Sequence, residues 1–312
     1  MTGAKEGTDV TVVVIAICSL PQLERAIRAI EDQVFNGTAE VIVASDPRLG
    51  ELTNLQSKFP RCVFLSRTDC RTPIELTVMA LNAATGDRVV LTEDSCIASP
   101  GWLTAVTGVS PDGRGAVGGV VEAMPGISNA MWAFCYVDFF KYMRPLGSGP
   151  APTLSVCNVA YRRADLVEVA GAWSKGFVET EMHNLLEHKF GPLWLTPDAE
   201  VRVVRNVTFG DAVYERYAFG RLFGAARIAE SPMKRRLFYL VASPALPLLL
   251  MSRMLAKARS DPALMKRFFS SLPELLTMVF AWSWGEMLGY LTRRRPRRVT
   301  TAPEKEQAQF FQ

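Results

Sequence analysis

The stretch GDRVVLTEDSCIASPGW, residues 86 to 102, decides how the N-terminal half of the chain folds. Its apolar run ends abruptly in Glu93, Asp94 and Ser95, and a Pro-Gly-Trp sequence follows at residues 100–102. A short apolar run bounded by polar residues predicts a buried strand, and Pro-Gly predicts a turn. Adjacent carboxylates repel each other and usually need a cation, so the end of this strand is a candidate site.

Three more β-branched runs precede this strand and alternate with helical patterns. They cover residues 10–17, 39–46 and 61–66, and the strand of the opening stretch covers residues 87–94. Residues 21–33 carry apolar side chains at helical spacing and begin with Pro, which suits a first helical turn. Strands that alternate with helices predict an α/β fold with a mainly parallel sheet.

Polar side chains follow two of the predicted strands, where sheets of this kind bind their ligands. The second strand ends in Asp46, and the fourth ends in Glu93, Asp94 and Ser95. Asp46 has an alternative interpretation as a turn residue, because Asp before Pro commonly opens a turn. The alternative for the acidic cluster is a strand end that is simply solvated.

The composition is typical of a globular protein without a nucleic-acid partner. The 312 residues are 49% hydrophobic and 21% charged, enough for one large domain or two modest ones. A formal net charge of +4 is too small to indicate DNA or RNA binding. The six cysteines are scattered without a C-x-x-C pair, which predicts reduced thiols. The first residues lack the features of a secretory signal, so we expect the bulk of the chain in the cytoplasm.

The segments VTVVVIAICSLPQLERAIRAIEDQ, AEVIVASD and IELTVMALNAATGDRVVLTEDSCIASPGWL follow one another in the first part of the chain. VGGVVEA, SVCNVAYRRADL, FVETEMHNLLEHKFG and YAFGRLFGAARI continue the series, which covers nearly all of residues 10–230. In this order the segments resemble the nucleotide-sugar half of the family 2 glycosyltransferases. The resemblance implies a GT-A-type (Rossmann-like) fold with a mixed, mainly parallel sheet flanked by helices. It also implies transfer of a sugar from a nucleotide diphosphate donor with inversion.

The resemblance further implies a metal site at the end of the fourth strand. The family has an Asp-x-Asp signature there, and counting back from Trp102 places Glu93 at its first acidic position and Ser95 at its second. A Mg²⁺ or Mn²⁺ ion would be held by Glu93, Asp94, Ser95, the diphosphate and water. Weaker metal dependence is implied because Ser95 offers only a neutral hydroxyl. The Glu-Asp-polar variant resembles a bacterial subgroup of the family. In the favoured interpretation of this chain, Asp46 would contact the nucleoside of the donor.

The transfer also needs a base that takes a proton from the acceptor hydroxyl. The family supplies it from a Glu-Asp pair that opens a helix, and the matching pair here is Glu179 and Thr180. Candidates for the base are Glu179, Glu181 and His183; Glu179 and His183 lie four apart on one helical face. We expect Glu179 to act as the base. The structural alternatives are a helix N-terminal charge for Glu179 and a packed imidazole for His183.

Three further residues are candidates for donor binding. The resemblance implies a backbone-ordering or acceptor-side role for Asn158, whose alternative is to satisfy loop amides. Arg216 and Arg221 could reach the diphosphate, because a guanidinium group binds phosphate in a bidentate manner. Their alternative is a solvated helix face.

The composition changes in the last third of the chain. Residues 237–252 carry no charge and are flanked by basic residues. A helix of this length spans about 24 Å, short of a hydrocarbon core near 30 Å, so we expect a re-entrant or interfacial segment. A second apolar run, residues 272–291, ends at the basic residues 293–298, which favour an anionic membrane surface. The alternative is a pair of helices that packs on the catalytic domain or on another subunit.

The sequence therefore predicts a catalytic domain at residues 1–230, a membrane-associated helical region at 231–298 and a disordered tail at 299–312. The expected activity is that of a hexosyltransferase acting on a lipid or glycan acceptor at the cytoplasmic face of the inner or cell membrane. The alternative is a catalytically silent nucleotide-sugar-binding scaffold, because Ser95 and Thr180 stand where the family has acids. A nucleotidyltransferase is disfavoured because no Gly-rich phosphate loop opens the first helix.

Overall fold

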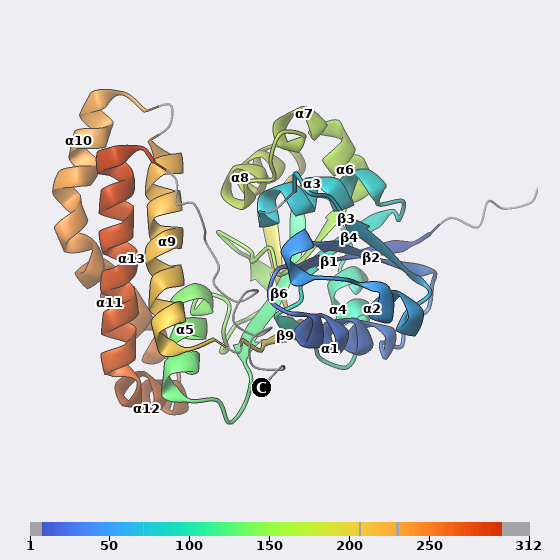
Figure 1. Cartoon of the computed structure of the whole chain (residues 1–312), viewed down its shortest axis with the longest axis horizontal. Helices are drawn as coiled ribbons and strands as arrows, with labels where there is room; N and C mark the ends of the chain where they lie inside the picture. Colours follow the sequence, from blue (N-terminus) through green and yellow to red (C-terminus); the bar gives the residue numbers. More distant parts are fainter. Residues whose placement is uncertain (1–7, 71, 206, 229–230, 295–312) are drawn as a thin grey trace, which may run out of the picture. The chain divides into compact units, whose positions relative to one another are not determined.

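The computed structural model describes residues 8–70, 72–205, 207–228 and 231–294. The chain divides into two compact units, each visible in Figure 1. The first, which we call the sheet unit, takes residues 1–122 and 142–204, and the second, the helical unit, takes 123–141 and 205–312. The chain passes between these units after residues 122, 141 and 204, and the predicted domain boundary near residue 230 stays a prediction.

The sheet unit is built on a nine-stranded mixed sheet in the order β3-β2-β1-β4-β8-β6-β9-β5, with β7 paired to β9. The parallel strands are β1 (Val10–Ala16), β2 (Ala39–Ser45), β3 (Cys62–Ser66) and β4 (Arg88–Glu93). Each agrees with its predicted range to within one residue at either end. All seven residues of β1 are buried, as expected for a strand covered on both faces. The predicted mainly parallel α/β sheet is confirmed.

The remaining strands are β5 (Cys96–Ala98), β6 (Ala116–Ala123), β7 (Gly149–Pro150), β8 (Asn158–Arg162) and β9 (Leu193–Val203). β8 lies antiparallel beside β4, with Asn158 opposite Thr92. β6 and β9 approach each other so closely that a Cβ atom on Gly119 would lie 1.9 Å from the carbonyl oxygen of Ala199. Only glycine fits at that position, which explains one of the paired glycines in the sequence.

Helices cover both faces of the sheet (Figure 1). One face carries α3 (Pro73–Ala83), α6 (Arg163–Glu168), α7 (Ala170–Trp173) and α8 (Glu179–Phe190). The other face carries α1 (Leu20–Glu31), α2 (Thr53–Lys58) and α4 (Trp102–Gly108). On the first face, Ile15 and Leu91 of the sheet share a buried core with Leu76 of α3 and Leu186 of α8. The core thus fixes the helix whose first residue is the predicted base.

The helical unit consists of α5 (Asn129–Phe139), α9 (Phe209–Arg227), α10 (Met233–Ala242), the 3₁₀ turn η2 (Ser243–Ala245), α11 (Leu246–Ala258), α12 (Pro262–Ser270) and α13 (Leu272–Thr292). α13 packs along α9 through glycines from both helices. A Cβ atom on Gly220 would lie 2.2 Å from the carbonyl oxygen of Trp282, and one on Gly285 would lie 2.0 Å from that of Tyr217. The two backbones are therefore in direct contact.

The apolar runs predicted in the last third of the chain are helical. Residues 237–252 fall inside Met233–Ala258, a helical segment that is long and apolar enough to cross a membrane by its length and composition. Its prolines stand in the first turns of η2 and α11, where the missing N–H group costs nothing, so they do not break the run. The second run, residues 272–291, coincides with α13. The predicted tail at 299–312 lies outside the described residues.

Candidate active site

The carboxyl ends of β1, β2 and β4 lie side by side at the edge where the sequence predicts donor binding. Ile15 of β1 lies opposite Glu93 of β4. The backbone N–H of Asp46, directly after β2, donates to the carbonyl oxygen of Ala16 at 2.9 Å. The fold therefore brings Asp46 and the acidic cluster at 93–95 to one edge of the sheet.

Asp94 is turned into the protein at this edge, and its side chain is buried. Its Oδ2 accepts hydrogen bonds from the backbone N–H groups of Ile17 at 3.0 Å and Cys18 at 2.7 Å. These bonds tie the tip of β4 to the loop between β1 and α1. Because Oδ2 accepts from two backbone donors, Asp94 organises this edge of the sheet, and its predicted metal contact stays a prediction.

Glu93 is half-buried and differs in this respect from its neighbour. The buried Ser95 hydroxyl donates to Glu93 Oε2 at 3.3 Å, so the two polar groups predicted for the metal site are in contact. Among the described residues, no group of three or more His, Cys, Asp or Glu side chains could hold a metal ion. The donor set here fits a Mg²⁺ or Mn²⁺ ion only if the diphosphate and water supply most of its ligands, an arrangement that Mg²⁺ commonly adopts.

Glu179 is the first residue of α8 and reaches the segment that leads into β8. Its Oε1 accepts a hydrogen bond from the backbone N–H of Val156 at 3.0 Å. The register of β8 against β4, with Asn158 opposite Thr92, places the residues before Asn158 beside the tip of β4. The segment 155–157 thus lies beside the tip of β4 and also contacts Glu179.

The electrostatics of Cys157 agree with this placement. The pKa of its thiol is raised by contact with Cys96, by burial and by the charge of Glu93. The Ser155 hydroxyl lies 3.1 Å from the Cys157 sulfur, which further orders the segment. Glu93 and Glu179 therefore flank the same three residues. The sequence analysis included these residues in the segment SVCNVAYRRADL but singled out only Asn158 from it.

His183 lies one turn after Glu179 on α8, and its side chain is buried. Its Nε2 is 2.8 Å from the Tyr161 hydroxyl, and burial lowers the pKa of the imidazole to about 4. The pKa of Tyr161 is raised by burial and by the charge of Glu179. His183 is thus a neutral, packed imidazole, and the geometry disfavours the catalytic role predicted for it. Glu181 is exposed on the same helix, as expected from its spacing.

Asp46 is buried and bound to Arg48, a residue that sequence reasoning missed. Its Oδ1 accepts from the Arg48 backbone N–H at 2.9 Å, and its carboxylate forms an ion pair with the Arg48 guanidinium. It caps the short 3₁₀ helix η1 (Pro47–Leu49), which is the turn role considered as its alternative. The predicted nucleoside contact of Asp46 stays a prediction, and a third of the Arg48 side chain is exposed at the same place.

Asn158 is buried at the start of β8 and orders the backbone around it. Its amide donates to the carbonyl oxygens of Val120 at 2.8 Å and Ala199 at 2.9 Å, and its Oδ1 accepts from Trp102 Nε1 at 2.8 Å. These bonds join β6, β9 and the first residue of α4. The Pro-Gly-Trp sequence of the opening stretch is thereby explained: Gly101, at a φ of 80°, turns the chain so that Trp102 is fully buried.

Arg216 and Arg221, the predicted diphosphate contacts, belong to α9 in the helical unit. Arg216 is buried, forms an ion pair with Asp138 and stacks on Phe134 at 4.5 Å. Burial lowers the pKa of its guanidinium to about 9. Arg221 donates to the Tyr217 hydroxyl at 3.3 Å. The geometry disfavours a diphosphate contact for Arg216, because its guanidinium is enclosed by protein groups.

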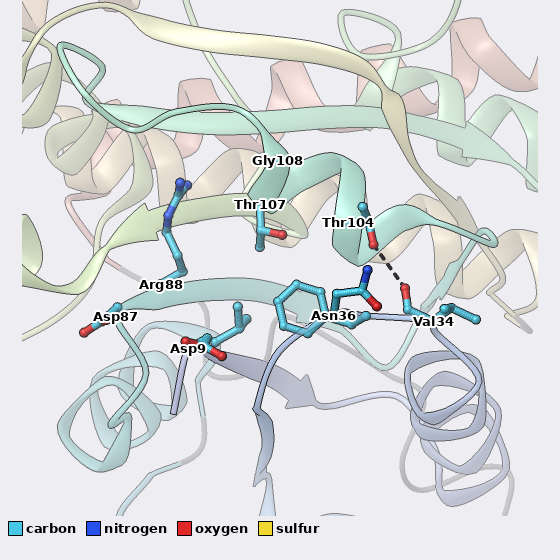
Figure 2. Close-up of a pocket in the computed structure, with 10 residues that line it drawn as sticks. Asp9, Val34, Asn36, Asp87, Arg88, Thr104, Thr107 and Gly108 are labelled. Carbon is cyan, nitrogen blue, oxygen red and sulfur yellow. Dashed lines mark hydrogen bonds between the residues drawn. The ribbon is translucent and has the colours of Figure 1, made fainter. Parts of the chain in front are cut away.

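A pocket of about 630 Å³ lies at the opposite ends of the strands, where β1 and β4 begin (Figure 2). Two of its polar side chains bond to the backbone: Thr104 donates to the Val34 carbonyl at 3.1 Å, and Arg88 donates to the Val109 carbonyl at 3.1 Å. Asp9, also on its rim, accepts from the Thr38 backbone. The predicted site residues do not line this pocket, and we place the candidate site at the carboxyl edge.

No protein-family model matches the chain, and a search of curated proteins finds no match. Among solved structures, the chain is similar to the mannosyltransferase PcManGT from Pyrobaculum calidifontis in complex with GDP-Man and Mn²⁺, with a TM-score of 0.55 and 16% identity over 89% of this chain and 86% of that one. It is also similar to GalNAc-T7 with UDP, GalNAc and Mn²⁺, with a TM-score of 0.51 and 14% identity over 65% of this chain and 44% of that one. The fold is therefore a glycosyltransferase fold of the GT-A type.

Proposed function

We propose that the protein transfers a hexose from a nucleotide diphosphate donor to a hydroxyl group of a lipid-linked or membrane-proximal acceptor. The observation that carries the proposal is the convergence of Glu93 and Glu179 on the segment 155–157, at the carboxyl edge of a GT-A-type sheet. Charge on the departing diphosphate and a proton on the attacking hydroxyl must be handled on opposite sides of the sugar. Two separate carboxylates suit these two tasks. The proposal includes inversion and membership of family 2, as the sequence resemblance implies.

In the proposed reaction, Glu179 takes the proton of the acceptor hydroxyl while the oxygen of that hydroxyl forms a bond to the anomeric carbon of the sugar. The bond from that carbon to the diphosphate breaks, and the nucleoside diphosphate leaves with the electron pair. The Val156 N–H group holds Glu179 Oε1 in place for this step. A divalent cation bound by Glu93, with Ser95 beside it, would neutralise charge on the diphosphate.

The test is turnover by the native chain and by Glu179→Gln, with Glu181→Gln as matched control in the same helical turn. Gln keeps an oxygen for the Val156 bond but cannot accept a proton. We expect Glu179→Gln to lower transfer by about 10²- to 10⁴-fold with donor binding retained, and Glu181→Gln to leave transfer unchanged. Release of nucleoside diphosphate from a panel of nucleotide sugars measures this. Undiminished turnover in Glu179→Gln would contradict the assignment.

A catalytically silent nucleotide-sugar scaffold is the second candidate, and the inward orientation of Asp94 favours it. Only Glu93 is then left as a half-buried acid in the cluster at 93–95. The scaffold predicts that nucleotide sugars raise the unfolding temperature while no donor is hydrolysed or transferred, with or without Mg²⁺ or Mn²⁺. The same panel therefore separates the two candidates.

A further inference from the structure

An apolar stripe runs along one side of the continuous helical segment Met233–Ala258 in the helical unit. Leu237 and Phe238 are 59% and 67% exposed, Val241 is 72% exposed, and Leu248 and Leu249 are 75% and 45% exposed. Their spacing of three, four and seven residues places them on neighbouring rows of one helix side. We call these five residues the apolar stripe.

The opposite side of the segment is fixed to α13. Tyr239 stacks on Tyr290 at 5.3 Å, and the Arg236 guanidinium donates to the Tyr290 carbonyl at 2.7 Å. Ser243, Pro247 and Met254 are buried. The segment therefore has one side packed on protein and one side that exposes large apolar groups, which a soluble surface rarely does over such a length.

The charge around the stripe selects its partner. Residues 231–260 contain six basic residues and no acidic residue. Lys234 and Arg235 are exposed before the stripe, and Arg253 and Arg259 are exposed after it. A stripe of apolar side chains with cations at both ends is complementary to a bilayer that carries anionic headgroups.

Contacts inside the helical unit decide against crossing. If Met233–Ala258 crossed the bilayer, α13 packed beside it and α9 packed on α13 would have to enter the hydrocarbon as well. α9 carries Glu215 and Arg227, and α13 carries Glu286 in contact with Arg227. Charged groups in the bilayer centre are costly. We propose that the apolar stripe docks the protein in the plane of an anionic lipid bilayer, without spanning it.

This proposal goes beyond sugar transfer, and vesicle binding tests it without donor, metal or acceptor. The full chain is floated with vesicles of phosphatidylcholine alone or mixed with phosphatidylglycerol. We expect binding to the mixed vesicles, weakened at least about tenfold in Val241→Glu/Leu248→Glu, since both side chains are exposed and their loss should not unfold the protein. The matched control is Val167→Glu, a 59% exposed position in the sheet unit, which should bind as the native chain does.

Two further measurements test the alternatives to in-plane docking, which are a membrane-spanning segment and a second copy of the chain packed on the stripe. Alkaline carbonate should release the bound protein, whereas retention in the vesicles would show a spanning segment and overturn in-plane docking. Sedimentation without lipid should give the same mass for native and double-variant chains. A native dimer that the double variant dissociates, together with absence of vesicle binding, would show that a second copy covers the stripe and would overturn the proposal.

Discussion

The neighbouring acids Glu93 and Asp94 at the tip of β4 differ in burial and in hydrogen-bond partners. Glu93 is the last residue of β4, whereas Asp94 is the first residue of the turn that follows, so the chain direction changes between them. Asp94 meets the N–H groups of Ile17 and Cys18, whereas Glu93 stays half-buried beside Ser95. Asp94 therefore serves the architecture of the edge, and the donor-side role of Glu93 stays a prediction.

A substitution pair separates these two roles. Asp94→Ala leaves two buried backbone N–H groups without their acceptor, which costs on the order of 1–3 kcal/mol for each unsatisfied group. We expect a clear drop in the free energy of unfolding for Asp94→Ala and little change for Glu93→Gln, measured by urea denaturation. Equal effects of the two substitutions on stability would refute this division.

His183 predicts a pH dependence of stability, because its folded pKa of about 4 lies below the ordinary value of 6.5. The unfolded chain binds a proton in that window and the folded chain does not, so the contribution is complete above pH 6.5. This contribution to the free energy of unfolding is lost as the pH falls toward 4. Because each pKa unit corresponds to about 1.4 kcal/mol, the total loss is about 3 kcal/mol. The free energy of unfolding of His183→Gln should fall less steeply over this range.

The other histidine of the chain provides the control. His188 is exposed near the end of the same helix. His188→Gln makes the same chemical change at an exposed position of the same helix, so it is the matched control for His183→Gln. If His183→Gln and the native chain lose stability in parallel between pH 6.5 and 4, the imidazole is not buried in its neutral form.

At the scale of elements, the contact of α9 with α13 depends on glycines in both helices. Besides Gly220 and Gly285, a Cβ atom on Gly224 would lie 2.3 Å from the Glu286 carbonyl oxygen, and one on Gly289 would lie 2.5 Å from that of Arg221. On each helix the two glycines are four residues apart and share one face. The pair of helices can approach this closely only because that face has no side chains.

Gly220→Ala should therefore destabilise the helical unit, although Ala is the better helix former. The added methyl group meets backbone atoms that cannot yield, and such overpacking costs about 1–3 kcal/mol. Gly210→Ala is the matched control on the same helix, because its Cβ would have only the Thr208 hydroxyl within 4.0 Å. Thermal unfolding should show a loss for Gly220→Ala and a neutral or small positive effect for Gly210→Ala.

The sequence predicts the strands and helices better than the contacts between residues that lie far apart in the chain. Period-2 and apolar runs are local signals, so the four parallel strands and α1 could be read directly. The boundary between the units could not, because the glycine contact that joins α9 to α13 links residues about sixty positions apart. For the same reason the sequence placed Arg216 near the donor, whereas its partner Asp138 comes from a distant helix. Glu93 was found from its place at the end of a strand and Glu179 by resemblance, whereas the contact of both with the segment 155–157 is visible only in the structure.

At the scale of the whole molecule, the two proposals belong to different units and can be tested separately. The candidate active site lies entirely in the sheet unit, and the apolar stripe lies entirely in the helical unit. A change in the stripe should therefore alter vesicle binding without altering affinity for a soluble donor. Conversely, a change at Glu93 should alter donor binding without altering vesicle binding.

Binding of a metal nucleotide should stabilise the whole chain, and this links the candidate site to global unfolding. A ligand that binds only the folded state at a hundred times its Kd stabilises it by about 2.7 kcal/mol. We expect a nucleoside diphosphate with Mn²⁺ to raise the unfolding temperature more than either alone, because Glu93 and the diphosphate would share the cation. Glu93→Gln should keep the response to nucleotide and lose the added response to Mn²⁺, whereas Glu181→Gln should keep both. If Mn²⁺ raised the unfolding temperature of Glu93→Gln with nucleotide as much as that of the native chain, the cation would be bound elsewhere or by the nucleotide alone. Glu93 would then not be a metal ligand.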